Sequence, residues 1–285
     1  MVVLKKVNVD GVSVFYREDG EVKSPTILLL HGFPSSSFQF RNLIPKLATT
    51  HHVIAPDLPG FGFTGVPAQL NYEYNFDSLA GTITSFTRIL NLDTFAIYVF
   101  DYGAPVGFRL ALARPDAITA IISQNGNAFE AGLSPFWDGL RKYWDDPSPE
   151  NLAPIQALTK MEATRFQYLH GEAHPDAVPP ETYHLDQALL DRPGNADIQL
   201  KLSFDYQTNI ALYPKFHEYF RTHQPPLLAV WGKNDPFFLP TGADAFKTVL
   251  PKAEIHFVDG GHFPLENHLE EVYDIISKFL SNNGA

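Results

Sequence analysis

Residues 94–112 constrain the fold more than any other part of this sequence. Residues 95–100 are a short run of aromatic and β-branched residues, which predicts a buried strand. Apolar residues then recur at helical spacing from Ala104 until Pro115, which ends or bends a helix. Almost nothing separates the strand from the helix. The side chain at the centre of the turn, Asp101, must therefore project beyond the carboxyl end of the strand.

Asp101 has two interpretations at this point. Aspartate is a favoured helix N-cap, and a turn from strand to helix needs a cap. The alternative is a nucleophile elbow with a carboxylate at its centre, because Gly103 and Ala104 are small enough to let the backbones pass closely. The rest of the chain decides between them.

Composition narrows the class of protein. The 285 residues are 45% hydrophobic and 13% aromatic, which suits a sizeable core and an aromatic-lined cavity. The formal net charge is -11 without long runs of lysine or arginine, so nucleic acids and anionic membranes are poor partners and small neutral organic substrates are expected. The absence of cysteine excludes disulfides and thiolate chemistry.

The start of the sequence has neither the apolar region nor the cleavage site of a signal peptide. No apolar run reaches membrane-spanning length. We therefore expect a cytoplasmic protein. A monomer and a homodimer are both compatible with the sequence.

Strands and helices alternate along most of the chain. Strands are predicted at residues 5–9, 12–16, 25–30, 52–55, 95–100, 118–122, 227–231 and 254–258. Helices are predicted at residues 38–47, 76–90, 104–113, 241–250 and 265–280. This alternation implies a mostly parallel sheet of eight strands with helices on both faces.

Residues 131–224 break the alternation. They are rich in tryptophan, tyrosine, proline, histidine and acidic residues, with helical segments and no convincing strand. We predict that residues 1–130 and 225–285 form one α/β core. The segment between them is predicted to be a helical cap, inserted after the sixth strand and lying over Asp101.

Three chemically active residues follow different strands of the predicted sheet. Ligands bind at the carboxyl ends of parallel strands, so Asp101, Asp235 and His262 are expected to converge there. Asp235 before Pro236 also suits an ordinary turn, and His262 also suits a core position. The His-Gly-Phe-Pro run at residues 31–34 leaves a fourth strand end, and four matched strand ends favour a shared site.

These motifs resemble the α/β-hydrolase superfamily, and within it the epoxide hydrolases and haloalkane dehalogenases that use an aspartate nucleophile. The resemblance covers the whole chain and rests on the motifs HGFP (31–34), DLPGFG (57–62), VFDYGAPVG (99–107), WGKNDPF (231–237) and GGHFPLE (260–266). It implies an α/β-hydrolase fold with a helical cap, and the chain order nucleophile, acid, histidine.

The resemblance also implies a role for each residue. Asp101 would attack an electrophilic carbon and form an alkyl-enzyme ester. Backbone N–H groups of Phe33 and Tyr102 would form the oxyanion hole. His262 would activate water, with Asp235 holding the ring. No metal or organic cofactor is needed for this chemistry, and the substrate pocket is expected to include His31, Trp137, Trp144, Phe166 and Phe237.

The leaving group separates the two activities. An epoxide oxygen leaves as an alkoxide and needs a hydroxyl donor. Residues 204–209 resemble the cap segment that carries a donor tyrosine in epoxide hydrolases, so Tyr206 is the expected donor, with an ordinary half-buried tyrosine as the alternative. At the position of the second donor stands Phe166. The remaining candidates for that role are Tyr168, Tyr143 and His170.

Haloalkane dehalogenases typically carry tryptophan after the nucleophile and often asparagine after the His-Gly pair, where this chain has Tyr102 and Phe33. Trp137 or Trp144 could supply one N–H, so dehalogenation is the alternative. Fluoroacetate dehalogenases carry arginines just after the nucleophile, where this chain has Tyr102 and Pro105, and this disfavours a carboxylate substrate.

A third hypothesis is a non-catalytic binding protein with the same fold. The expected activity is hydrolysis of a small epoxide, a detoxification reaction.

Overall fold

The computed structural model describes residues 1–284. Eight strands form one sheet in the order β1-β2-β4-β3-β5-β6-β7-β8. They are β1 Val3–Val9, β2 Val12–Asp19, β3 Thr26–Leu30, β4 His52–Pro56, β5 Phe95–Phe100, β6 Ile118–Gln124, β7 Leu227–Gly232 and β8 Glu254–Val258. Strand β2 is antiparallel to β1 and β4, and every other pair is parallel. The predicted eight-stranded, mostly parallel sheet is confirmed.

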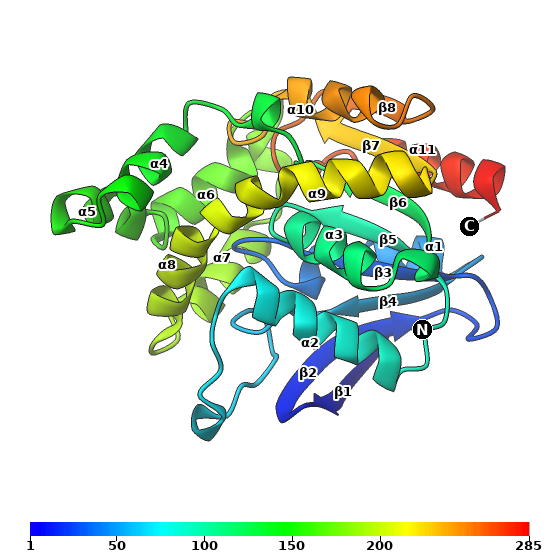
Figure 1. Cartoon of the computed structure of the whole chain (residues 1–285), viewed down its shortest axis with the longest axis horizontal. Helices are drawn as coiled ribbons and strands as arrows, with labels where there is room; N and C mark the ends of the chain where they lie inside the picture. Colours follow the sequence, from blue (N-terminus) through cyan, green and yellow to red (C-terminus); the bar gives the residue numbers. More distant parts are fainter. Residues whose placement is uncertain (285) are drawn as a thin grey trace.

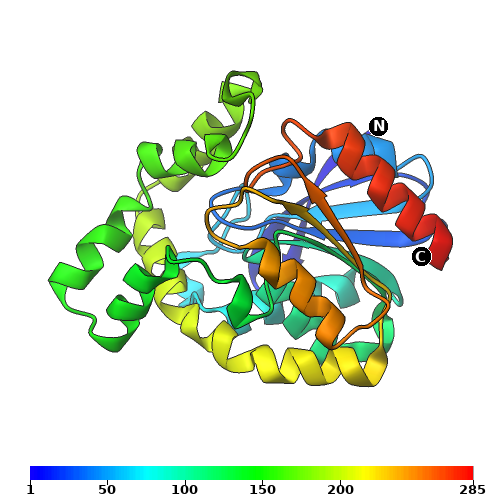
Figure 2. The same cartoon turned by 90° about the horizontal axis from the view of Figure 1, so that it is seen from above.

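Helices cover both faces of the sheet, as predicted. Helices α1 (Leu43–Leu47) and α11 (Leu269–Asn283) lie on one face, and α2 (Phe76–Ile89), α3 (Gly103–Ala113) and α10 (Pro240–Ala245) cover the other. Figure 2 shows the sheet between α11 and the helices of the opposite face. All six residues of β5 are buried because a hydrophobic layer lies on each side of it. No helix within residues 1–284 is long and apolar enough to cross a membrane.

Two predicted helices have different ends. The helix predicted at residues 241–250 is α10 followed by a 3-10 turn at Phe246–Thr248. The last helix begins at Leu269 rather than Leu265, because residues 263–268 form hydrogen-bonded turns that bury Leu265. Apolar spacing alone does not distinguish such turns from the first turn of a helix.

Six α-helices and no strand occupy the described chain between β6 and β7, apart from an isolated β-bridge. They are α4 Trp137–Asp145, α5 Pro149–Ala157, α6 Met161–Leu169, α7 Pro180–Leu190, α8 Asn195–Asp205 and α9 Gln207–His223. Figure 1 shows α4 and α5 beyond one end of the sheet, whereas α9 runs back beside α3. Phe216 and Phe220 of α9 pack on Phe108 of α3, with ring centroids 5.5 and 5.4 Å apart. Helix α9 thus packs on the core, although it belongs to the insertion. The division of the chain into a core and a separate cap domain at residues 131–224 stays a prediction.

Candidate active site

Asp101 lies at the turn between β5 and α3. Its backbone φ is 47°, in the left-handed region that only a few non-glycine residues adopt. The residue at the N-cap of α3 is Tyr102, and no side chain caps the helix. The Asp101 carboxylate instead accepts a hydrogen bond of 2.6 Å from the backbone N–H of Phe33. The helix-cap interpretation of Asp101 is therefore wrong.

The approach of the HGFP loop to this turn requires a glycine. A Cβ atom added to Gly32 would lie 2.3 Å from Oδ1 of Asp101, which no side chain can tolerate. The absence of that atom lets the backbone N–H of Phe33 reach the carboxylate. Two loops that are far apart in sequence thereby share one polar centre.

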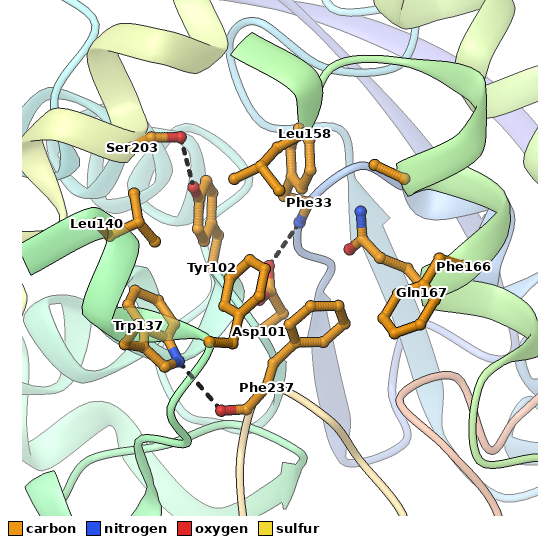
Figure 3. Close-up of a pocket in the computed structure, with 12 residues that line it drawn as sticks. Phe33, Asp101, Tyr102, Trp137, Leu140, Leu158, Phe166, Gln167, Ser203 and Phe237 are labelled. Carbon is orange, nitrogen blue, oxygen red and sulfur yellow. Dashed lines mark hydrogen bonds between the residues drawn. The ribbon is translucent and has the colours of Figure 1, made fainter. Parts of the chain in front are cut away.

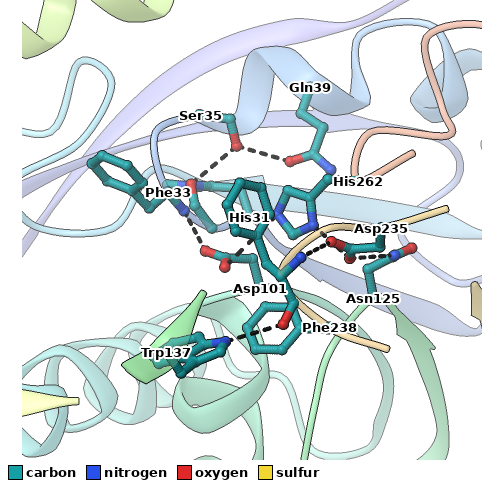
Figure 4. A network of polar contacts seen from close by, with 12 residues as sticks. His31, Phe33, Ser35, Gln39, Asp101, Asn125, Trp137, Asp235, Phe238 and His262 are labelled. Carbon is teal, nitrogen blue, oxygen red and sulfur yellow. Dashed lines mark hydrogen bonds and ion pairs between the residues drawn. The ribbon is translucent and has the colours of Figure 1, made fainter. Parts of the chain in front are cut away.

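His262 and Asp235 complete this centre from the ends of β8 and β7 (Figure 4). Nδ1 of His262 lies 2.8 Å from Oδ2 of Asp235, and Nε2 lies 3.8 Å from Oδ2 of Asp101. Asp235 also accepts hydrogen bonds from Asn125 Nδ2 at 2.6 Å and from the backbone N–H of Phe237 at 2.7 Å. Because the Asp235 carboxylate accepts, Nδ1 of His262 carries the proton and Nε2 is directed toward Asp101.

Burial and neighbouring charges shift the pKa values of Asp101 and His262. Burial raises the pKa of Asp101 to about 6, although His262 and the backbone N–H groups of Phe33 and Tyr102 act to lower it. Burial acts to lower the pKa of His262, but the charges of Asp235 and Asp101 outweigh it and raise that pKa above its usual value. Asp101 is thus ionised at neutral pH and loses its charge in mild acid.

A small cavity opens onto the Asp101 carboxylate (Figure 3). Its volume is about 70 Å³, which is enough for a few water molecules or one small ligand. Its walls are mostly aromatic and aliphatic, and they consist of Phe33, Asp101, Tyr102, Phe136, Trp137, Leu140, Leu158, Ala163, Phe166, Gln167, Ser203 and Phe237. Within residues 1–284, histidine and carboxylate side chains do not gather as a metal site would require. The cavity suits a small, mostly apolar molecule.

The predicted pocket residues divide into two groups. Trp137, Phe166 and Phe237 line the cavity as expected, with Phe166 at 44% exposure on its rim. His31 and Trp144 do not line it. The ring of His31 is fully buried and accepts a hydrogen bond of 3.0 Å from the backbone N–H of Leu58, so it joins two loops instead.

The tyrosines predicted as proton donors have their hydroxyls elsewhere. Tyr206 is buried beside Trp137, but its hydroxyl is hydrogen bonded to that of Tyr213 and it does not line the cavity. The hydroxyl of Tyr168 donates to the buried Asp186. The ring of Tyr143 packs on Phe204, beside a hollow away from Asp101. None of the three residues lines the cavity, although the charge of Asp101 helps to raise the pKa of Tyr206. Their predicted donor role therefore has no support from the cavity lining and stays a prediction.

Three other residues with polar side chains line the cavity, namely Tyr102, Gln167 and Ser203. Sequence reasoning missed Gln167 and Ser203, and it gave Tyr102 a role through its backbone N–H only. The hydroxyls of Tyr102 and Ser203 lie 3.4 Å apart. The amide of Gln167 faces the cavity from α6 and has no hydrogen-bond partner within residues 1–284 (Figure 3). Ala163, Phe166 and Gln167 recur at helical spacing, a pattern that could have identified this face of α6.

Comparison with known proteins places this geometry in context. A family model described as alpha/beta hydrolase fold matches residues 25–269. An uncharacterized hydrolase of Saccharomyces cerevisiae is 48% identical over 278 residues, which cover 96% of this chain and 95% of that protein. A haloalkane dehalogenase of Psychrobacter cryohalolentis is 27% identical over 280 residues, which cover 95% of this chain and 88% of that protein. Among solved structures, the epoxide hydrolase CorEH is similar in fold, with a TM-score of 0.77, 22% identity and 99% of both chains covered.

Proposed function

The chain belongs to the alpha/beta hydrolase fold family, and within this family we propose that it hydrolyses a small epoxide to a diol through an ester on Asp101. One observation carries the proposal. A carboxylate at the strand-to-helix turn faces a histidine that a second carboxylate holds from behind. A carboxylate nucleophile with a base for water suits the formation of an alkyl ester and its hydrolysis.

In the first step, a carboxylate oxygen of Asp101 would attack one epoxide carbon from the side opposite its C–O bond. The new C–O bond forms as the epoxide C–O bond breaks. The departing oxygen would take a proton from a hydroxyl on the cavity wall, because an alkoxide is a poor leaving group. The cavity's small size and apolar walls support a compact, uncharged substrate.

In the second step, Nε2 of His262 would take a proton from water, whose oxygen adds to the carbonyl carbon of the ester. The buried Nε2 has no hydrogen-bond partner within residues 1–284, so it is free to bind that water. Backbone N–H groups of Phe33 and Tyr102 would hold the oxyanion, and Asp235 would stabilise the histidine cation. The bond to the alkyl oxygen then breaks, and the diol leaves with the proton from His262. Asp101 keeps the oxygen from water, and the second water proton returns to the hydroxyl that protonated the departing epoxide oxygen, which restores both groups.

The donors on the cavity wall favour an epoxide over a haloalkane. The indole N–H of Trp137 donates to the carbonyl of Phe237 at 3.0 Å, and that of Trp144 donates to the carbonyl of Ser203 at 2.9 Å. These N–H groups are therefore engaged and not available to a halide. Tyr102 and Ser203 both line the cavity, and their hydroxyls lie 3.4 Å apart. Burial and the Asp101 charge raise the pKa of Tyr102, so its hydroxyl is protonated at neutral pH. We assign the donor role to Tyr102, assisted by Ser203.

Tyr102→Phe is expected to slow ester formation by a factor on the order of 10², the scale for removing a positioned acid. Phenylalanine keeps the ring packing on Phe76 and loses only the hydroxyl. Single-turnover kinetics with an epoxide, followed by protein mass, would measure the step. Ser203→Ala is the matched variant, and a larger loss there would make serine the donor. If neither variant slows ring opening, the donor lies elsewhere, and Tyr206→Phe is the next variant.

A direct assay tests the choice between the two substrate classes. The purified protein would be incubated with panels of small epoxides and of chloro- and bromoalkanes, and diol and halide would be measured separately. We expect diol from at least one epoxide and no halide release. The dehalogenase relative makes the opposite outcome the natural alternative. Bromide release without any diol would replace the proposed function with haloalkane dehalogenation.

Ester formation is also expected to depend on pH. The pKa of Asp101 is raised to about 6, so the nucleophile is charged above this pH and increasingly protonated below it. The single-turnover rate of ester formation should therefore fall as pH is lowered through about 6. In His262→Ala, the positive charge that lowers the pKa of Asp101 is gone, so the fall should move to higher pH. A rate that stays flat between about pH 5 and 8 would contradict this assignment.

A further inference from the structure

The loop that follows α6 lies directly on the loops that carry Asp235 and His262. This loop, residues 170–174, is called the brace below. Nδ2 of Asn234, the residue before Asp235, donates to the carbonyl oxygen of Gly171 at 2.9 Å. A Cβ atom added to Gly261, the residue before His262, would lie 2.0 Å from the carbonyl oxygen of His170. The backbone of the brace thus touches both catalytic loops next to their functional residues.

Glu172 is the centre of these contacts. Its side chain is 1% exposed, and a buried carboxylate is costly unless its oxygens are well bonded. Its Oε1 accepts the backbone N–H of Gly261 at 2.8 Å, and its Oε2 accepts Nδ2 of Asn267 at 3.0 Å. Oε2 also lies 3.3 Å from Nε2 of His268. The residues that contact the Glu172 carboxylate therefore lie on both sides of His262 in the sequence.

Helix α6 connects the brace to the cavity. Helix α6 ends at Leu169, directly before the brace, and it presents Phe166 and Gln167 to the substrate space. The helix is a short rigid element, so a shift of its cavity face moves the brace as well. Glu172 therefore connects the cavity face of α6 to the loop that carries His262.

We propose that Glu172 is a positioning residue, which holds the His262 loop in the orientation required for hydrolysis of the Asp101 ester and couples that orientation to α6. The inference rests on the proposed two-step function. It predicts an effect on one step only. Attack by Asp101 does not need His262 as a base, whereas attack by water does. Loss of Glu172 should therefore spare ester formation and slow ester hydrolysis.

A matched control exists in the same insertion. Nε2 of Gln199 on α8 donates to the backbone carbonyl of Gly60 at 3.1 Å, and Gln199 is 1% exposed. This bond joins the insertion to the core, as the Glu172 bonds do, but it does not reach the loops of Asp235 or His262. Gln199→Ala therefore reports the general cost of weakening contact between the insertion and the core.

The experiment compares Glu172→Ala, Glu172→Gln and Gln199→Ala in single-turnover reactions with an epoxide. Glu172→Ala is expected to keep the rate of ester formation within about twofold and to slow ester hydrolysis by at least about tenfold, since small misplacements of a catalytic group carry penalties of this size. Glu172→Gln should lie between this variant and the parent, because an amide oxygen can still accept the N–H of Gly261. Gln199→Ala should affect the two steps equally or not at all.

A spectroscopic readout separates failure of this inference from failure of the proposed function. The Nδ1 proton of His262, bonded to Asp235, should give a far-downfield proton resonance in NMR. Glu172→Ala should shift or broaden it, and Gln199→Ala should not. An unchanged resonance, or equal losses in both steps, would overturn the positioning role. If no variant forms an ester but the resonance still responds to Glu172, the positioning role stands and the proposed epoxide chemistry fails.

Discussion

Asp101→Asn is expected to abolish turnover, with a loss on the order of 10⁶-fold, the scale seen when a nucleophile is removed from a catalytic triad. An amide has no negative charge with which to attack an epoxide carbon. Its oxygen can still accept the backbone N–H of Phe33, as the carboxylate does at 2.6 Å. The turn and its strained backbone therefore have the same support in the variant.

The same variant is expected to keep or gain stability at neutral pH. Because the pKa of Asp101 is raised to about 6, folding favours its protonated form, and this contribution is lost as pH rises through about 6. A neutral asparagine has no such loss. The melting temperature of Asp101→Asn at pH 7 should equal or exceed that of the parent, with the difference shrinking in acid.

Diol formation and thermal unfolding, measured on freshly purified protein, check both expectations. Slow return of activity during storage would indicate deamidation of the new asparagine to aspartate, and mass spectrometry would detect it. Steady residual activity without deamidation would exclude Asp101 as the nucleophile.

His262→Ala is expected to stop the reaction at the ester. The variant keeps Asp101 and the cavity wall but loses the base that activates water, so hydrolysis should slow by about 10²–10⁴-fold. Incubation with an epoxide should give protein heavier by one substrate molecule, with no diol. Peptide mapping should locate the added mass on Asp101.

The double variant Asp101→Asn/His262→Ala is the control for this trap, since it has the same cavity and no nucleophile. Added mass on the double variant would mean that another residue is alkylated. Diol formation by His262→Ala at the parent rate would exclude His262 as the base. Reversible binding of the epoxide, with no added mass on any variant, would favour the non-catalytic binding protein considered from the sequence.

The sequence by itself determined the sheet and the meeting of three residues. Short apolar runs identify the strands in the sequence. In a parallel sheet, the carboxyl ends of these strands lie at one edge. Asp101, Asp235 and His262 each follow such a strand within a few residues, so little freedom separates their positions in sequence from their positions in space. The structure places His262 between the two carboxylates accordingly.

Only the tertiary structure decided which side chains of the insertion face the cavity. Helical spacing tells which residues share a face, but the neighbours of the helix decide where that face points. Tyr206 lies on the predicted segment, yet its hydroxyl bonds Tyr213, while Ser203, three residues earlier, lines the cavity. Glu172 has no local motif at all, because its partners lie about 90 residues further along the chain. Contacts between segments so distant in sequence arise from packing, which no local pattern records.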